Sequence, residues 1–136
     1  MRHKLNSEII VSLCSDHQPH ERDAKLAPFA STEPGISALE TLLPLALQLV
    51  KDEVTSLTDI ISLLTHKPAQ LLNIKAGNLS PGQPADLCIC NPTIEWQLTA
   101  ENMHSRGKNT PFLNQTFKGK VTHTFVSGKL VFETKS

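Results

Sequence analysis

Three polar residues lie close enough in the sequence to carry out acid–base or metal chemistry: Asp16, His17 and His20. A carboxylate can ligate a divalent metal ion and can also take a proton from an attacking water, as hydrolysis requires. A histidine beside it can ligate metal or donate a hydrogen bond to an anionic substrate. Pro19 restricts the backbone just before His20 and limits the directions its imidazole can take. Taken alone, the composition favours a surface loop with a capping aspartate, because the spacing is less specific than a motif such as H-E-x-x-H.

The segment that precedes these residues predicts a strand. Residues 9–14 are almost continuously apolar, which is typical of a strand covered on both faces in a parallel sheet or barrel. The carboxyl end of such a strand is where α/β-barrel enzymes keep their catalytic groups. Residues 15–35 are polar and contain Pro19, Pro28 and Pro34, so they predict a long loop of the kind that usually has a function.

Helical patterns follow this loop. The apolar spacing of residues 36–50 predicts a helix, and Pro44 inside it should kink or split that helix. Ser56 is a suitable N-cap for a second helix over residues 57–64. Pro68 suits the first position of a third short helix.

The last third of the chain has a different character. Residues 86–94 alternate as a strand does, and residues 99–119 form a polar connector. Two β-rich runs around Ser127 and Gly128 predict a hairpin. The sequence therefore predicts two portions, residues 1–76 with a strand, a loop and helices, and residues 77–136 with a small β-rich domain.

The composition excludes several classes of protein. Thirteen basic and thirteen acidic residues balance, so no electrostatic footprint for nucleic acid exists, and no apolar run approaches the roughly 20 residues of a membrane span. Three cysteines without a secretory pattern fit free thiols in a reducing compartment, so we expect a cytoplasmic protein. Cys88 and Cys90 point to one face of a strand, where we expect them to pack in a core rather than bind metal.

A series of motifs then points to a family. The chain from Cys14 onward resembles the C-terminal part of dihydroorotases of the amidohydrolase superfamily. The stretches that carry the resemblance are specific because they occur in the same order over more than a hundred residues. They are S-D-H-Q-P-H (15–20), A-K-L-A-P-F (24–29), E-P-G-I (33–36), L-E-T-L-L-P-L (39–45), L-T-H-K-P-A (64–69), G-N-L (77–79), G-Q-P-A-D-L (82–87), S-R-G-K-N-T-P-F (105–112), G-K-V (119–121) and G-K (128–129).

The resemblance implies a fold and a set of site residues. It implies an α/β fold in which residues 1–76 form the last strand and helices of a (β/α)₈ amidohydrolase barrel and residues 77–136 form a small β-sandwich-type domain. Asp16 would be a metal-bound aspartate that moves a proton from the attacking hydroxide to the leaving nitrogen, with zinc as the expected metal, binuclear in the complete family enzyme. His20, Pro34 and Gly35 would contact the substrate, although Pro34 cannot donate a backbone N–H.

The reaction implied is reversible hydrolysis of a cyclic amide, between dihydroorotate and carbamoyl aspartate, in pyrimidine biosynthesis. The other metal ligands of the family have no counterpart in this sequence, so we expect a piece of an enzyme that is inactive alone. The alternative is a noncatalytic dihydroorotase-like subunit that supports the assembly of aspartate transcarbamoylase. Intact Asp16 and His20 favour descent from a catalytic form. A nonfunctional piece that folds poorly is the third possibility.

Overall fold

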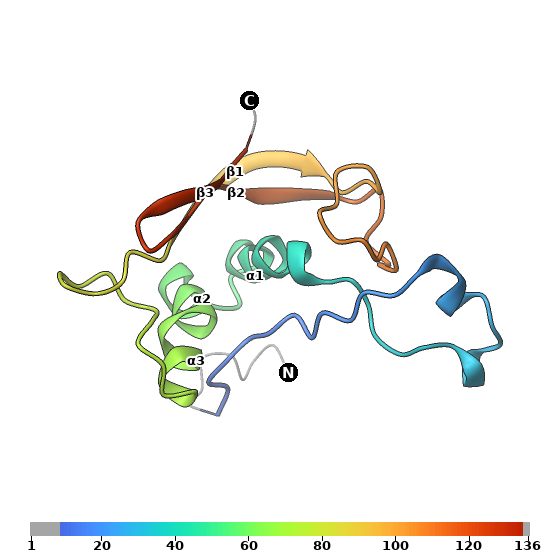
Figure 1. Cartoon of the computed structure of the whole chain (residues 1–136), viewed down its shortest axis with the longest axis horizontal. Helices are drawn as coiled ribbons and strands as arrows, with labels where there is room; N and C mark the ends of the chain where they lie inside the picture. The colour runs from blue at the N-terminus through green and yellow to red at the C-terminus, as the bar shows by residue number, and fades with distance from the viewer. Residues whose placement is uncertain (1–8, 135–136) are drawn as a thin grey trace.

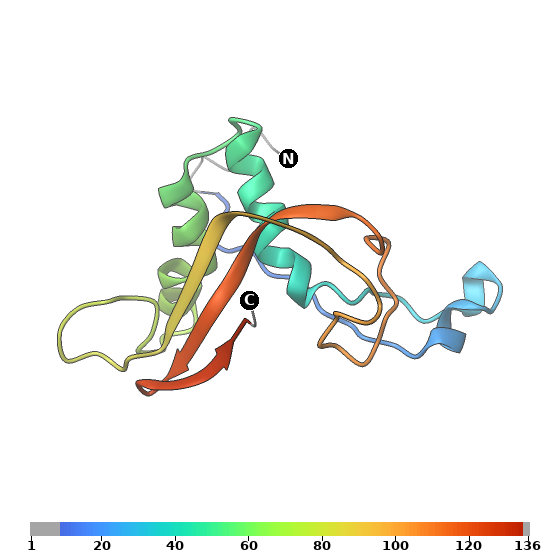
Figure 2. The same ribbon diagram turned by 90° about the horizontal axis from the view of Figure 1, so that it is seen from above.

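The structure is a computed structural model that describes residues 9–134. A three-stranded sheet lies over helix α1, and helices α2 and α3 lie beside α1 on the same side of the sheet (Figure 1). The long loop before α1 extends away from both layers (Figures 1 and 2). The elements are η2 (Arg22–Lys25), η3 (Phe29–Ser31), η4 (Leu39–Thr41), α1 (Leu42–Lys51), α2 (Leu57–Leu64), α3 (His66–Leu71), β1 (Leu87–Gln97), β2 (Thr116–Val126) and β3 (Lys129–Glu133).

The predicted buried strand over residues 9–14 is wrong. The segment has no strand geometry in this chain, and the side chains of Ile9 and Val11 are 74% and 43% exposed. A strand requires a neighbour along most of its length, and among the described residues the only backbone partner that this segment has is the carbonyl of Leu63, 3.0 Å from the Leu13 nitrogen. Cys14, at the end of this segment, is exposed as well.

The predicted kink at Pro44 is also wrong. Helix α1 begins at Leu42 after the 3₁₀ turn η4, which places Pro44 at the third position of the helix. The first four N–H groups of a helix have no partner within it, so a proline there removes no helical hydrogen bond. Pro44 is buried at the start of an unbroken helix.

The start of the second helix is set by the N-cap that the sequence predicts. Helix α2 begins after Ser56, whose hydroxyl accepts the Asp59 N–H at 3.1 Å and donates to the Asp59 carboxylate at 2.7 Å. Helix α3 begins at His66, so Pro68 stands at its third position rather than its first. Ile60 and Leu63 of α2 are the most deeply buried apolar side chains of this helical layer.

The sheet is antiparallel with the order β1–β2–β3. The predicted hairpin is confirmed: Val126 pairs with Lys129, and Ser127 and Gly128 both have positive φ (50° and 77°), as a two-residue type I′ turn requires. Strand β1 is interrupted by a register shift between Asn91 and Glu95, which accommodates Pro92 within the strand. A small core of Leu98, Met103 and Phe117 closes the end of the sheet.

Candidate functional site

The candidate site begins with Asp16 in the motif loop, which we define as residues 15–20. Asp16 has a positive φ of 44°, uncommon for a residue with a side chain, and its carboxylate is exposed. Its Oδ1 accepts a hydrogen bond from Gln18 Nε2 at 3.1 Å. This hydrogen bond is itself exposed, so it does not withdraw the carboxylate from solvent.

His17 anchors the motif loop to the start of the helical layer. Its Nδ1 lies 3.1 Å from the backbone nitrogens of both Ala38 and Leu39. Backbone N–H groups can only donate, so Nδ1 accepts and the ring proton of neutral His17 is on Nε2. His17 also forms an isolated parallel bridge with Ile36. The sequence analysis named His17 among three residues able to carry out chemistry, but in the structure its Nδ1 is used to hold the loop against the start of the helical layer.

His20 and Pro34, which the sequence analysis placed at the substrate, come together. His20 Nε2 lies 2.8 Å from the Pro34 carbonyl oxygen, so this nitrogen carries the proton and donates. The missing N–H of Pro34 therefore does not prevent a contact with His20. Gly35 has φ = 91°, and a side chain there would collide with the Gln18 side chain, so two separate constraints require glycine.

A cavity of about 770 Å³ opens beside His20. Three of the side chains that line it are cationic, and its described lining contains no Asp or Glu. Lys25 donates to the Glu33 carbonyl, and Lys108 Nζ donates to the carbonyls of Met103 and Ser105 at 2.8 and 2.6 Å. Asp16 does not line this cavity. The lining residues are His20, Lys25, Ile36, Ala100, Arg106, Lys108, Asn109, Thr110, Pro111 and Leu113.

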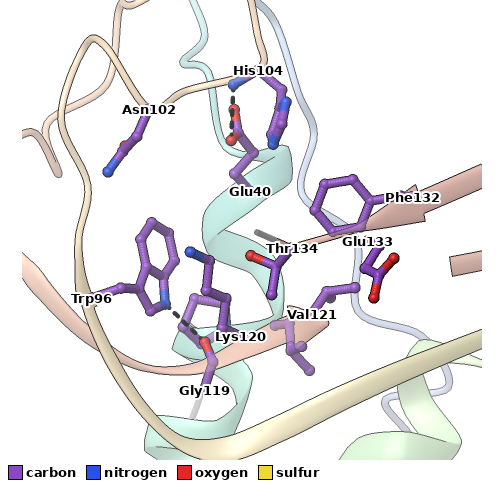
Figure 3. A pocket seen from close by; sticks show the side chains of 12 residues that line it. Glu40, Trp96, Asn102, His104, Gly119, Lys120, Val121, Phe132, Glu133 and Thr134 are labelled. Atoms are coloured by element: carbon purple, nitrogen blue, oxygen red, sulfur yellow. Dashed lines mark hydrogen bonds between the residues drawn. The ribbon is translucent and has the colours of Figure 1, made fainter. Parts of the chain in front are cut away.

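A second cavity, of about 480 Å³, lies between α1 and the sheet and contains none of the predicted site residues (Figure 3). Its lining is mostly apolar. Trp96 Nε1 donates to the Gly119 carbonyl at 2.9 Å, and Lys120 Nζ lies 5.9 Å from the centroid of the Trp96 ring system. At its mouth the Glu40 carboxylate accepts the backbone N–H groups of His104 and Ser105 at 3.0 and 3.1 Å, which ties the connector to η4.

The cysteines differ from the prediction. Cys88 is exposed and Cys90 is half-buried, so the pair does not form a core. Partial burial is the largest cause that raises the pKa of the Cys88 thiol, the neighbouring Cys90 adds to it, and a hydrogen bond with Thr124 opposes it. Within residues 9–134 no three His, Cys, Asp or Glu side chains are grouped so that they could hold a metal ion. In the same range no helix is long and apolar enough to cross a membrane.

Comparison with known proteins identifies the family. The sequence profile of the amidohydrolase family matches residues 1–131. The chain belongs to the amidohydrolase family. It is 44% identical over 133 residues to a dihydroorotase-like protein of Pseudomonas aeruginosa and 39% identical over 133 residues to a dihydroorotase of Syntrophus aciditrophicus, which confirms the predicted resemblance. Both alignments cover 98% of this chain and 31% of the relative.

The solved structures agree on the fold. An L-hydantoinase (dihydropyrimidinase) of Arthrobacter aurescens has a TM-score of 0.86 and is 29% identical, over 97% of this chain and 31% of its own. The chain therefore adopts the arrangement of one part of an amidohydrolase, and it spans about a third of the length of the curated relatives it matches.

The sequence analysis missed the residues that hold the motif loop. The connector ends at residue 115 in the structure, because β2 begins at Thr116 and not after residue 119 as predicted. Gly107 and Asn109, on this connector (residues 99–115), contact the loop directly. Both lie in the stretch S-R-G-K-N-T-P-F that contributed to the family resemblance, and that stretch was the one signal that could have drawn attention to them.

Proposed function

We propose that this chain is the part of a dihydroorotase that carries the proton-transferring carboxylate and binds the carboxylate of the substrate. A dihydroorotase interconverts dihydroorotate and carbamoyl aspartate in pyrimidine biosynthesis. In this proposal residues 1–76 are barrel and residues 77–136 a small β domain, and the 136-residue chain alone does not turn over substrate. The family and the names of its relatives support a cyclic amide hydrolase.

The observation that carries the proposal is the charge of the cavity beside His20. Dihydroorotate has a carboxylate, whereas hydantoins and dihydropyrimidines are neutral rings. A cavity lined by the cationic side chains of Lys25, Arg106 and Lys108 attracts an anion and has no comparable advantage for a neutral ring. The site therefore supports the dihydroorotase assignment over the hydantoinase one.

The proposed chemistry uses two side chains. A water oxygen adds to the ring carbonyl carbon, and the Asp16 carboxylate accepts the proton that this water loses. The ring C–N bond then breaks, and Asp16 returns the same proton to the departing amide nitrogen. One water is consumed, and the products are a ureido nitrogen and a carboxylic acid, which then releases its remaining proton to solvent to give the carboxylate. His20 holds the substrate carboxylate in position, which lowers the entropic cost of the reaction.

Zinc, which the resemblance implies, is not held by the described residues alone. Asp16 is exposed, and within residues 9–134 no three His, Cys, Asp or Glu side chains are grouped so that they could hold a metal ion. In the proposal Asp16 is one ligand of a zinc site and the remaining ligands come from outside this range. The proposal also requires that other parts of the complete enzyme cover this carboxylate.

A chimeric enzyme tests the proposal. The 133 residues of this chain that align with the Syntrophus aciditrophicus dihydroorotase, at 39% identity, would replace the matching segment of that enzyme. We expect the folded chimera to hydrolyse dihydroorotate and its Asp16→Asn variant to lose roughly 100- to 10,000-fold in kcat, since general acid–base catalysis contributes about that much. Asp23→Asn is the matched control, because Asp23 is also exposed and lies just after the motif loop, in η2. A folded chimera without turnover, or full activity in Asp16→Asn, contradicts the proposal.

The His20→Ala variant distinguishes substrates that have a carboxylate from those that lack one. We expect the KM of the chimera for dihydroorotate to rise about tenfold or more, because a charge-assisted hydrogen bond is lost. Hydrolysis of dihydrouracil, which lacks the carboxylate, should change little. An unchanged KM for dihydroorotate would overturn the role of His20.

A second candidate function has one observation in its favour. The relative at 44% identity is named a dihydroorotase-like protein, not a dihydroorotase. A noncatalytic subunit that supports aspartate transcarbamoylase would co-elute with that enzyme in size-exclusion chromatography and would be unaffected by Asp16→Asn. Turnover by the chimera together with no co-elution excludes this candidate.

A further inference from the structure

The side chain of Asn109 hydrogen-bonds both to the motif loop and to the segment that follows Pro34. Its Oδ1 accepts the backbone N–H of His20 at 2.7 Å. Its Nδ2 donates to the carbonyls of Gln18 at 3.1 Å and Gly35 at 3.3 Å. The amide thus connects the motif loop to the segment that follows Pro34, across sequence separations of 74 to 91 residues.

The orientation of this amide is determined by its partners. A backbone N–H can only donate and carbonyls can only accept, so exchange of Oδ1 and Nδ2 would break all three contacts. The Ser37 hydroxyl, on a residue only 2% exposed, lies 3.0 Å from Oδ1 and 2.6 Å from the Gly107 carbonyl. The Ser37 N–H donates to the Asn109 carbonyl at 3.0 Å. Backbone and side chain of Asn109 therefore both hold the same segment.

Gly107 adds a steric constraint to these hydrogen bonds. A Cβ at this position would lie 2.7 Å from the His20 nitrogen and 2.7 Å from Pro19 Cβ. The connector therefore lies directly against the backbone of the motif loop, and the two segments meet in both views of the ribbon (Figures 1 and 2).

We propose that Asn109 is a positioning residue that holds the backbone of His20 and the Pro34–Gly35 segment in one fixed geometry. This inference rests on the proposed function, in which His20 binds the substrate carboxylate. Asn109 acts through the loop backbone and transfers no proton. Its effect is to keep the imidazole donor and the Gly35 carbonyl at a constant separation before substrate arrives.

Hydrogen exchange on the 136-residue chain tests the positioning without any need for catalysis. The readout is the protection of the Gln18, His20 and Ser37 amides, with α2 as internal reference. Removal of three hydrogen bonds in Asn109→Ala should raise exchange at these amides by up to about hundredfold, since each bond contributes about a factor of five. Asn109→Asp, which keeps Oδ1 and loses both Nδ2 bonds, should give a smaller increase.

Asn102 offers the matched control. It lies on the same connector, and its side chain makes two comparable bonds, accepting the Thr99 N–H at 2.9 Å and donating to the Gln97 carbonyl at 2.6 Å. If Asn109 were merely structural, Asn102→Ala and Asn109→Ala would raise exchange throughout the chain to the same degree. The proposal would be overturned if the two variants raised exchange equally, or if the exchange rate of the His20 amide were unchanged in Asn109→Ala.

Kinetics of the chimera then distinguish the two hypotheses. Asn109→Ala should raise KM for dihydroorotate more than it lowers kcat, while Asn102→Ala should change neither. If Asn109→Ala raises hydrogen exchange in the motif loop and the chimera has no turnover, the positioning role is supported and the proposed function is rejected. If the chimera turns over equally well with Asn109→Ala and the amides of the motif loop stay protected from exchange, only the positioning role is rejected.

Discussion

Replacement of Gly107 by alanine tests how tightly the connector fits the motif loop. Gly107 is buried, and its φ lies outside the left-handed region, so alanine meets no backbone strain there. The added Cβ would be 2.7 Å from the His20 nitrogen, and it must move about 0.7 Å to reach an ordinary contact of 3.4 Å. Overpacking of this kind costs about 1–3 kcal/mol, which for a chain of this size lowers the midpoint of thermal unfolding by about 3–15 °C.

The assay combines thermal unfolding by circular dichroism with hydrogen exchange at the His20 amide. Gly82→Ala is the control: φ there is 84°, and a Cβ would meet nothing within 4 Å. That variant should lose about 1 kcal/mol through backbone strain and leave the motif loop unchanged. Gly107→Ala should instead raise the hydrogen-exchange rate of the His20 amide. The close approach of connector and loop would be refuted by wild-type melting and wild-type exchange in Gly107→Ala.

Three further predictions concern other parts of the chain. Ser56→Ala removes the cap that accepts the Asp59 N–H, and urea denaturation should report a loss of about 1 kcal/mol, whereas an unchanged midpoint would reject the cap. Trp96→Phe removes the hydrogen bond to the Gly119 carbonyl, and a similar loss of about 1 kcal/mol is expected in the same assay, against none if the bond is absent. Because burial raises the pKa of Cys88, its alkylation rate should reach half-maximum at a higher pH than that of an unstructured cysteine peptide; an equal or lower midpoint contradicts this.

Features that depend on neighbours in sequence were predictable. The Ser56 cap and the Ser127–Gly128 turn each need only a few adjacent residues in the right conformation, and both are present. The position of Pro44 was harder to interpret, because its effect depends on where the helix begins, and the 3₁₀ turn η4 moved that beginning to Leu42.

Features that depend on distant partners were not predictable. The strand at residues 9–14 needs a neighbouring strand to satisfy its backbone, and apolar composition alone does not supply one. The contact between Asn109 and His20 spans 89 residues, and nothing in the spacing of either segment indicates it. The pairing of His20 with Pro34 lies between these cases: both were candidate site residues, but their 2.8 Å contact emerges only from the fold of the loop.

The measurement that tests the central claim most directly is kcat/KM for dihydroorotate in the folded chimera with and without the Asp16 carboxylate. The account predicts that Asp16→Asn removes at least about 100-fold of this value while Asp23→Asn leaves it within about twofold. Equal values for Asp16→Asn and the unsubstituted chimera would show that another group moves the proton, and the proposed role of the motif loop would be wrong.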